Sequence, residues 1–394
     1  MMSSTSTAIP AEEELHWLAL KMVAGLGTRR AGQLIETFRS PEAVFRASRS
    51  ELEEAGLPGS VAQSISSGCA FEEAVEQQGK MRAAGACLVT ITSADYPPLL
   101  REVYDPPVVL YARGKIEILQ HTLFAMVGTR RPTPYGMAVA ERLAADLSAA
   151  GLVVTSGMAS GIDTASHKGA LSVNAPTVAV LGCGVDIVYP SENRKLAEQI
   201  AEKGVVLSEF PMGSAAFPQN FPIRNRIVSG ACVGLLVVEG AQYSGSAITA
   251  RLALDQGREV FAVPGNITSK MSWGPNLLIK QGAKLVQDWN DVIVDLPPAV
   301  RRKLIDDGKQ RLLDLGDDAE APTVNGNRAD LSGPESEISR RVLQKLSVDA
   351  PMHLDSLIEI MERCSTSEVI SALFELEMLG LAKQLPGRQY VRKF

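Results

Sequence analysis

The sequence lacks several features that define large classes of protein. None of its apolar runs approaches the ~20 residues that a membrane-spanning helix needs. Residues 1–11 have neither a basic start nor an apolar stretch, so we expect no secretory signal there. These absences together predict a soluble, cytoplasmic protein without a membrane partner.

Cysteine and histidine are also scarce. The five cysteines form no Cys-x-x-Cys pair, so we expect reduced thiols rather than disulfides or structural zinc. The four histidines, at positions 16, 121, 167 and 353, are too scattered to indicate a metal site. Because no histidine, carboxylate and nucleophile share a suggestive spacing, we expect no catalytic residues and no enzymatic activity.

Positive charge is in deficit over the chain as a whole. The 39 lysines and arginines are outnumbered by 45 aspartates and glutamates, which gives a net charge of −6. A polyanionic partner would therefore have to be bound by a local cluster of cations. The balance of 45% hydrophobic and 21% charged residues is that of an ordinary globular protein, and the length allows two or three domains.

The common nucleotide-binding motifs are missing. No GxxxxGK[ST] sequence occurs, and Gly182–Ile187, "GCGVDI", has only two of the three glycines of GxGxxG. A nicotinamide cofactor and a P-loop nucleotide are both disfavoured, and we expect no cofactor.

The composition that is present changes along the chain and predicts four segments. Residues 12–80 are typical of short helices with glycine turns, and residues 85–295 alternate apolar runs such as "TVAVLG" and "LLVVEG" with amphipathic stretches. Such alternation predicts an α/β fold with a parallel sheet. Residues 296–334 are polar and rich in Asp, Gly and Pro, which predicts a flexible linker. Residues 335–394 resemble three helices and a hairpin, a winged-helix pattern.

Glycine-rich loops follow the predicted strands of the α/β segment. Ligands of open α/β sheets bind at the carboxyl ends of the strands, where glycines let backbone amides approach closely. Two loops contribute candidate phosphate-binding residues: Gly128, Thr129, Arg130 and Arg131 in the first, and Ser156 and Gly157, followed by Lys168, in the second. The alternative is that these glycines only form tight turns.

A third candidate segment, "QNFPIRNRIVSG", combines an aromatic residue with amides and cations: Asn220, Phe221, Arg224, Asn225 and Arg226. Cations that follow a backbone beside an aromatic ring that stacks a base are typical of single-strand binding, where stacking contributes roughly 1–3 kcal/mol per base. Phe221 could instead be a core aromatic, and Arg224 and Arg226 could form ion pairs. His167 is better explained as a packed helix histidine than as a catalytic one.

Six segments in unbroken order resemble the bacterial DNA-processing protein A (DprA/Smf) family: "MVGTRRPTPYG", "TSGMASGIDTASHKGAL", "VAVLGCGVDIVYPSEN", "NFPIRNRIVSG", "SGSAITARLALDQGREVFAVPGNI" and "GPNLLIKQGAKLV". The resemblance covers roughly residues 85–295. It implies an extended Rossmann-like domain that binds single-stranded DNA without sequence preference and forms a homodimer. It also implies protection of incoming strands and loading of the RecA recombinase during natural transformation.

The resemblance also assigns roles to residues. Gly128, Thr129 and Arg130 match a strand-grasping loop, Ser156 and Gly157 a second phosphate turn, and Lys168 a neighbouring cation. Phe221, Arg224 and Asn225 match the family's FPxRN segment, in which Phe221 would stack a base. The expected dimer interface is Asn276, Leu277, Leu278 and Ile279, although an apolar helix there could equally be core.

The flanking segments are less informative. The N-terminal region resembles paired helix-hairpin-helix or SAM-like elements, and Arg29 and Arg30 follow its Gly-Leu-Gly turn, but acidic residues surround them. In the C-terminal region, the expected recognition helix Thr366–Leu379 carries three glutamates and no Lys or Arg. Because a helix that enters a DNA groove needs cations, we expect this winged helix to bind protein or to be structural.

Two other functions remain open from sequence alone. The chain could process nucleoside monophosphates on a related fold, with Glu239 of "VVEGAQYSGSAITA" as the acid, although the PGGxGT-type turn of such enzymes is missing. It could also be a RecA-binding scaffold with incidental DNA affinity.

Overall fold

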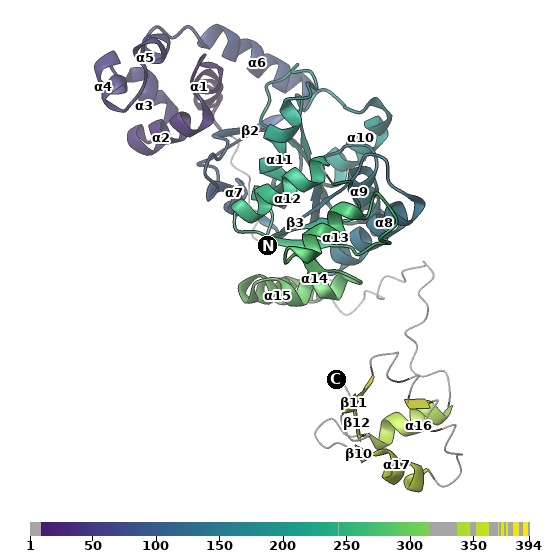
Figure 1. Cartoon of the computed structure of the whole chain (residues 1–394). Coiled ribbons are helices and arrows are strands. Elements are labelled where there is room, and N and C mark those ends of the chain that lie inside the picture. The colour runs from purple at the N-terminus through teal and green to yellow at the C-terminus, as the bar shows by residue number, and fades with distance from the viewer. Residues whose placement is uncertain are drawn as a thin grey trace. The chain divides into compact units, whose positions relative to one another are not determined.

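The computed structural model describes residues 9–314 except position 243, and residues 337–346, 352–361, 369, 372–373, 376, 381–385 and 389–392. The chain divides into two compact units, residues 1–318 and 319–394 (Figure 1). In the part of the chain that the structure describes, no helix is long and apolar enough to cross a membrane.

Short helices form the N-terminal part of the first unit: α1 (Ala11–Met22), α2 (Thr28–Phe38), α3 (Pro41–Arg46), α4 (Arg49–Glu54), α5 (Gly59–Ser66) and α6 (Phe71–Ala84). Local signals set their boundaries. Ser40 Oγ accepts a hydrogen bond from the Ala43 amide at 3.1 Å and Pro41 opens α3, while Ser48 and Glu51 form a reciprocal capping box on α4. The α1–α2 turn contains Gly25 at φ 78°, a conformation that favours glycine.

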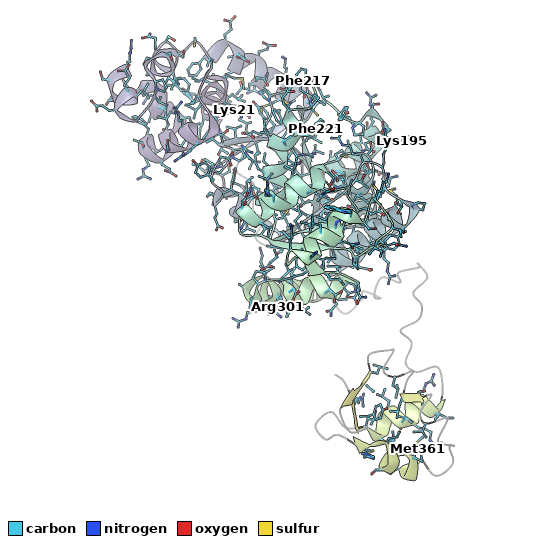
Figure 2. The ribbon with its side chains drawn as sticks, viewed as in Figure 1. Lys21, Lys195, Phe217, Phe221, Arg301 and Met361 are labelled. Atoms are coloured by element: carbon cyan, nitrogen blue, oxygen red, sulfur yellow. The ribbon has the colours of Figure 1, made fainter. Side chains whose placement is uncertain are left out.

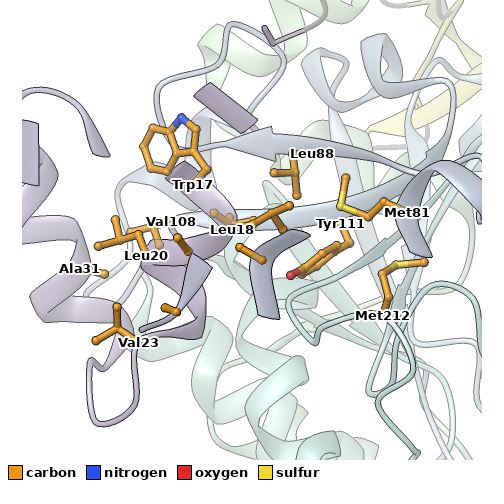
Figure 3. Close-up of a cluster of buried hydrophobic side chains, with 14 of the residues drawn as sticks. Trp17, Leu18, Leu20, Val23, Ala31, Met81, Leu88, Val108, Tyr111 and Met212 are labelled. Atoms are coloured by element: carbon orange, nitrogen blue, oxygen red, sulfur yellow. The ribbon is translucent and has the colours of Figure 1, made fainter. Parts of the chain in front are cut away.

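These helices share one hydrophobic core with the edge of the sheet. Trp17, Leu18 and Met81, from α1 and α6, pack together with Leu88 and Tyr111 of the first two strands (Figure 3). All five side chains are buried, so the N-terminal helices are fixed to the α/β part by apolar packing.

The α/β part is built on a nine-stranded sheet in the order β1-β2-β6-β5-β4-β3-β7-β8-β9. Its strands are β1 (Cys87–Thr90), β2 (Val109–Gly114), β3 (Leu123–Val127), β4 (Val153–Ser156), β5 (Thr177–Leu181), β6 (Val205–Ser208), β7 (Gly234–Val237), β8 (Glu259–Ala262) and β9 (Lys284–Leu285). Pairing is parallel from β6 to β9, as the apolar runs predict, whereas β1 and β2 pair antiparallel at one edge.

Helices cover both faces of the sheet, which explains why its strands are apolar throughout. One face packs against α8 (Pro134–Ala149) and α9 (Ile162–Ser172), and α10 (Arg194–Lys203) contacts β5 and β6. The other face packs against α11 (Asn220–Gly230) and α12 (Gly245–Asp255) (Figure 1). The strand order reverses between β3 and β7, and such a reversal opens a crevice at the carboxyl ends of the strands.

The remaining helices are short, and their bounds complete the unit: α7 (Pro98–Arg101), the 3-10 turns η1 (Ile116–Gln120) and η2 (Ser191–Asn193), α13 (Trp273–Lys280), α14 (Trp289–Asp295) and α15 (Pro298–Asp314). Helix α15 lies in the segment for which the composition predicts a flexible linker. Its Leu304 is buried in the core beside α8, so the first part of that segment is helical and packed. The rest, residues 315–334, lies outside the described residues.

The second unit contains α16 (Glu337–Lys345), β10 (Met352–His353), α17 (Leu354–Ile360), β11 (Ala382–Leu385) and β12 (Gln389–Arg392). Its strands form a small antiparallel sheet in the order β10-β12-β11. Val342, Leu357, Leu373 and Leu376 lie in its core, and the arrangement is the predicted winged helix. The three glutamates of the expected recognition helix lie outside the described residues.

Candidate nucleic-acid interface

The loop after β3 is held between the end of β7 and the start of α9. The Thr129 amide donates to the Glu239 carbonyl at 2.7 Å, and the Thr129 carbonyl accepts from the Ile162 amide at 3.2 Å. A Cβ on Gly128 would lie 2.5 Å from Ile162 Cγ1, so this close approach requires glycine. The loop therefore has a fixed backbone from which the exposed side chain of Arg130 projects.

Glu239 braces the same loop. Its carboxylate accepts hydrogen bonds from the Thr133 amide at 2.9 Å and the Thr133 hydroxyl at 2.6 Å, and it packs against Gly136 in the first turn of α8. A carboxylate at the N-terminal end of a helix is stabilised by the helix dipole. Glu239 is thus buried in a structural role and is not among the residues that line the crevice.

Arg224 joins the ends of β4 and β5. It is only 4% exposed, and its Nη1 donates to the Gly157 carbonyl at 2.5 Å and also to the Val180 carbonyl. Burial lowers the pKa of Arg224, and the neighbouring Asp163 carboxylate opposes that effect. Burial likewise raises the pKa of Asp163 against the influence of Arg224 and of the Ala159 amide, which donates to it at 3.3 Å. Arg224 is therefore an internal cation that holds the second loop in place.

Phe221 lies at the start of α11 (Figure 2), between two cations. The guanidinium carbon of Arg130 is 4.9 Å from the ring centroid, and that of Arg224 is 5.9 Å away. Both distances are within cation–π range. The ring of Tyr189, from the loop after β5, is 5.6 Å from Phe221 between centroids. Phe221 is half-buried, so part of its ring remains available to a ligand.

These residues surround a cavity of about 280 Å³ at the crevice. The structure brings seven of the twelve predicted strand-binding residues to its wall: Gly128, Thr129, Arg130, Gly157, Phe221, Arg224 and Asn225.

The start of α12 supplies a wall that sequence reasoning missed, formed by Ser244, Gly245, Ser246 and Thr249. Ser244 does not cap α12 with its side chain, so the first amides of that helix remain available to an anion. The "SGS" sequence at the start of α12, in the segment that follows β7, was the available signal.

Five of the predicted strand-binding residues lie outside the cavity wall: Arg131, Ser156, Lys168, Asn220 and Arg226. Arg131 is exposed in the loop after β3, and its amide donates to Thr129 Oγ1 at 3.2 Å. Ser156 Oγ is buried and donates to the Met126 carbonyl at 2.6 Å, while Asn220 Nδ2 donates to the Gly182 carbonyl at 2.9 Å. Both polar groups are therefore used within the fold. Lys168 is exposed on α9 but does not line the cavity.

Arg226 does not line the crevice, which corrects its grouping with the residues there. Its side chain is buried and forms ion pairs with Asp105 at 2.9 Å and Glu209 at 2.8 Å. Glu209 is also paired with Lys21 of α1 at 3.3 Å and accepts from Thr28 Oγ1 at 3.1 Å. The sequence alternative of an ion-paired arginine holds for this position, and the pair links α11 to the N-terminal helices.

His167 is a packed core residue, as the sequence suggested. It is fully buried in α9, and its Nδ1 lies 2.8 Å from Thr177 Oγ1. Burial lowers the pKa of His167 to about 3, so the ring is neutral at physiological pH. Among the described residues, no group of His, Cys, Asp or Glu side chains is arranged to hold a metal ion.

The predicted dimer residues lie on α13. Asn276 is bound internally, because its side chain accepts from the Gly265 amide at 3.1 Å and donates to the Gly265 carbonyl at 2.9 Å. Leu277, Leu278 and Ile279 are half-buried, and Leu278 packs against the core. Part of this helix therefore serves the fold, and a dimer interface on it stays a prediction.

Comparison with known proteins agrees with this architecture. Residues 87–297 match the family model described as DNA recombination-mediator protein A, and residues 327–388 match that of the DprA winged helix domain. The chain is 32% identical to Protein Smf of Synechocystis over an alignment of 402 residues, gaps included, which spans 97% of this chain and 99% of that protein. It is 42% identical to the DNA processing protein DprA of Bacillus subtilis over 217 residues, or 55% of this chain and 73% of that protein.

A solved structure shares the fold as well. The X-ray structure of DprA from Streptococcus pneumoniae matches with a TM-score of 0.60 and 33% identity, over 72% of this chain and 98% of that one. The family models, the full-length relative and the solved structure all point to the same group of proteins. The chain belongs to the DNA-processing protein A (DprA/Smf) family of DNA recombination mediators.

Proposed function

We propose that this protein binds single-stranded DNA without sequence preference at the crevice between β3 and β7. The observation that carries the proposal is the exposed Arg130 guanidinium stacked on Phe221 at the mouth of the cavity. In the described residues Arg130 forms no ion pair, so its charge is available to a phosphate.

The cavity wall favours a sugar-phosphate chain. The glycine loops allow close backbone approach, and the first amides of α12 add a partial positive charge. Arg224 adds a second positive charge from below Phe221 while it holds Gly157 in position. Asn225 is the one lining side chain with an amide suited to base edges, so we expect contacts to phosphate and ring faces to dominate and sequence preference to be absent.

The wider role follows from the family. Its description as a recombination mediator supports a function in which the bound strand is protected and transferred to RecA during DNA uptake and natural transformation. We propose a cytoplasmic homodimer for this role, with the exposed part of α13 as the contact. Within the chain, we propose that residues 85–295 bind the strand, that residues 12–80 form the helical domain, and that residues 335–394 are an accessory.

The test is a titration of the full chain with fluorescent oligo-dT and oligo-dA at two salt concentrations. We expect similar affinities for the two sequences. Affinity should fall with salt at a slope of about −0.7 per neutralised phosphate in a plot of log K against log salt. Arg130→Ala should weaken binding to both and reduce the slope by about 0.7. Arg142→Ala on α8, which removes an exposed arginine paired with Asp146, is the matched control. Wild-type binding that ignores salt, or an Arg130→Ala variant that binds like the control, would refute the proposal.

The enzymatic alternative depends on a free acid at the crevice. Glu239, the predicted candidate, is buried and bonded to Thr133. Incubation of the protein with nucleoside monophosphates checks this alternative directly. Release of free base would show that the cavity is a catalytic site and not a strand-binding site.

A further inference from the structure

A second cavity, of about 530 Å³, separates α2 from the antiparallel edge of the sheet. We call it the interdomain cleft. Its α2 wall includes Thr28, Arg29, Glu36 and Arg39, and its opposite wall includes Ile91, Arg101 and Tyr104. A volume of this size is in the range that holds a ligand as large as a nucleotide. The binding of DNA at the β3–β7 crevice makes no use of this cleft.

The interdomain cleft is basic in an acidic protein. Three arginines and one glutamate line it, whereas the whole chain carries a net charge of −6. In the part of the chain that the structure describes, none of these arginines forms an ion pair. A neighbouring cavity behind β1 is lined by Glu13, Glu14 and Asp95 instead. Unpaired cations gathered on low-dielectric walls concentrate positive potential, so the cleft favours an anionic ligand.

An aromatic platform lies beside these cations. Tyr104 is 75% exposed, and the Arg29 guanidinium carbon is 4.6 Å from its ring centroid. Arg29 also donates a hydrogen bond to the Tyr104 hydroxyl. An exposed ring that is oriented by a guanidinium group offers a surface on which a planar base can stack.

The opposite wall is held rigidly by the backbone. Arg101 donates from Nε to the Ile91 carbonyl at 3.0 Å and from Nη2 to the Ser93 carbonyl at 3.1 Å. Its side chain is therefore fixed without a carboxylate partner. The first turn of α2 faces the cleft through Thr28 and Arg29, and its N-cap residue, Gly27, provides no side-chain cap.

We propose that the interdomain cleft is a second nucleic-acid site, in which Arg29, Arg39 and Arg101 bind phosphodiester groups and Tyr104 stacks a base. An acidic peptide would satisfy the cations but would leave the exposed tyrosine without a planar partner. The cleft therefore fits a nucleic-acid strand better than an acidic protein segment. This site gives the N-terminal helices a direct part in strand binding.

Photo-crosslinking of the full chain to oligo-dT that carries 5-iododeoxyuridine tests the proposal site by site. After irradiation and proteolysis, mass spectrometry should find an adduct on the peptide that contains Tyr104. The adduct should persist in Arg130→Ala, because that variant leaves the cleft intact. It should be lost in the double variant Arg29→Ala/Arg39→Ala and retained in Arg46→Ala, which removes an exposed arginine of α3 paired with Glu42.

Affinity measurements complete the test. Tyr104→Ala should weaken binding of long oligo-dT about tenfold, and Tyr104→Phe should restore it because the ring is kept. The double arginine variant should lower the salt slope by about 1.4, or 0.7 for each phosphate that is no longer neutralised. If adducts form at Phe221 but never at Tyr104, the cleft proposal is wrong while the crevice proposal stands. If dTMP competes as well as the oligonucleotide does, the cleft binds free nucleotides and the proposed strand site is refuted.

Discussion

Arg130 and Arg224 carry the same guanidinium group and approach the same phenyl ring, yet their surroundings give them different roles. Arg130 is exposed at the cavity mouth, whereas Arg224 is buried and bound to the carbonyls of Gly157 and Val180. An exposed cation contributes to ligand affinity, and a buried one contributes to the fold as long as its partners are kept. Residue type alone predicted both as strand contacts, because burial is not visible in a list of residue types.

Substitution of Arg224 should therefore act on stability first. Arg224→Ala leaves two strand-end carbonyls without their donor and Asp163 without its neighbouring cation, so we expect the free energy of unfolding to fall by about 3 kcal/mol. Urea denaturation measures this loss, and Arg142→Ala should stay within about 0.5 kcal/mol of wild type. The double variant Arg224→Ala/Asp163→Asn should recover part of the loss. A wild-type stability for Arg224→Ala would contradict the structural role.

His167 should make stability depend on pH. Its pKa is about 3 in the folded protein against 6.5 for an ordinary histidine, because burial opposes the charged form. The unfolded chain therefore binds a proton below about pH 6.5 that the folded protein does not bind, and stability is complete above that pH and declines as the pH falls toward 3.

Between about pH 6.5 and pH 5, the free energy of unfolding should fall by about 2 kcal/mol more in wild type than in His167→Gln. Urea titrations at the two pH values provide the measurement. A difference that is independent of pH would show that His167 is not protonated on unfolding.

Among the elements, α11 connects the crevice to the rest of the molecule. Phe221, Arg224 and Asn225 are spaced i, i+3 and i+4, so a helix places them on one face, and all three line the cavity. Arg226 is two residues beyond Arg224 and points to a different side, where it meets Glu209. In a helix, the spacing of 3.6 residues per turn therefore places Phe221, Arg224 and Asn225 on one face and Arg226 on another. Sequence analysis grouped Arg226 with its neighbours by residue type alone.

The buried carboxylate of Glu209 should couple α11 to α1 and α2. The pKa of Glu209 is lowered because Lys21, Arg226 and Thr28 together outweigh its burial, so its stabilising contribution is present above pH 4.5 and lost as the pH falls through the lowered value. Glu209→Gln should cost about 3 kcal/mol, because it leaves Lys21 and Arg226 without their counter-charge.

Hydrogen exchange locates this effect. In Glu209→Gln, amides of α1, α2 and α11 should exchange faster than in wild type, while those of β4 should be affected least. Glu141→Gln, at an exposed position of α8, is the control. Uniform acceleration across the sheet would argue against a local coupling.

Over the whole molecule, the sequence predicted the fold class, the parallel strands and the winged helix. The parallel strands could be predicted because continuous apolar runs between glycine turns indicate strands that are buried on both faces of a sheet. It did not predict that β1 and β2 add an antiparallel edge, since the direction of a short strand is set by tertiary pairing. The wall that α12 adds to the cavity was missed for a related reason. Its serines are ordinary helix-start residues until the sheet order brings the start of α12 to the same cavity as Arg130.

The division of the chain into two compact units gives a prediction at this scale. Removal of residues 319–394 should leave the first unit folded, because its cores are formed by residues before that boundary. The shortened chain should bind oligo-dT with unchanged affinity and salt slope in the titration with fluorescent oligonucleotides. A marked loss of affinity would assign part of the strand-binding surface to the winged helix.

The apolar side chains shared by α1, α6 and the sheet edge (Figure 3) also determine where the chain can be divided. A fragment that begins at β1 would leave Leu88, Val108 and Tyr111 without their cover, and exposed apolar surface on an edge strand promotes aggregation. Expression of the α/β region by itself should thus yield insoluble material. A chain that ends after residue 318 keeps the N-terminal helices, so the apolar side chains of the sheet edge stay covered.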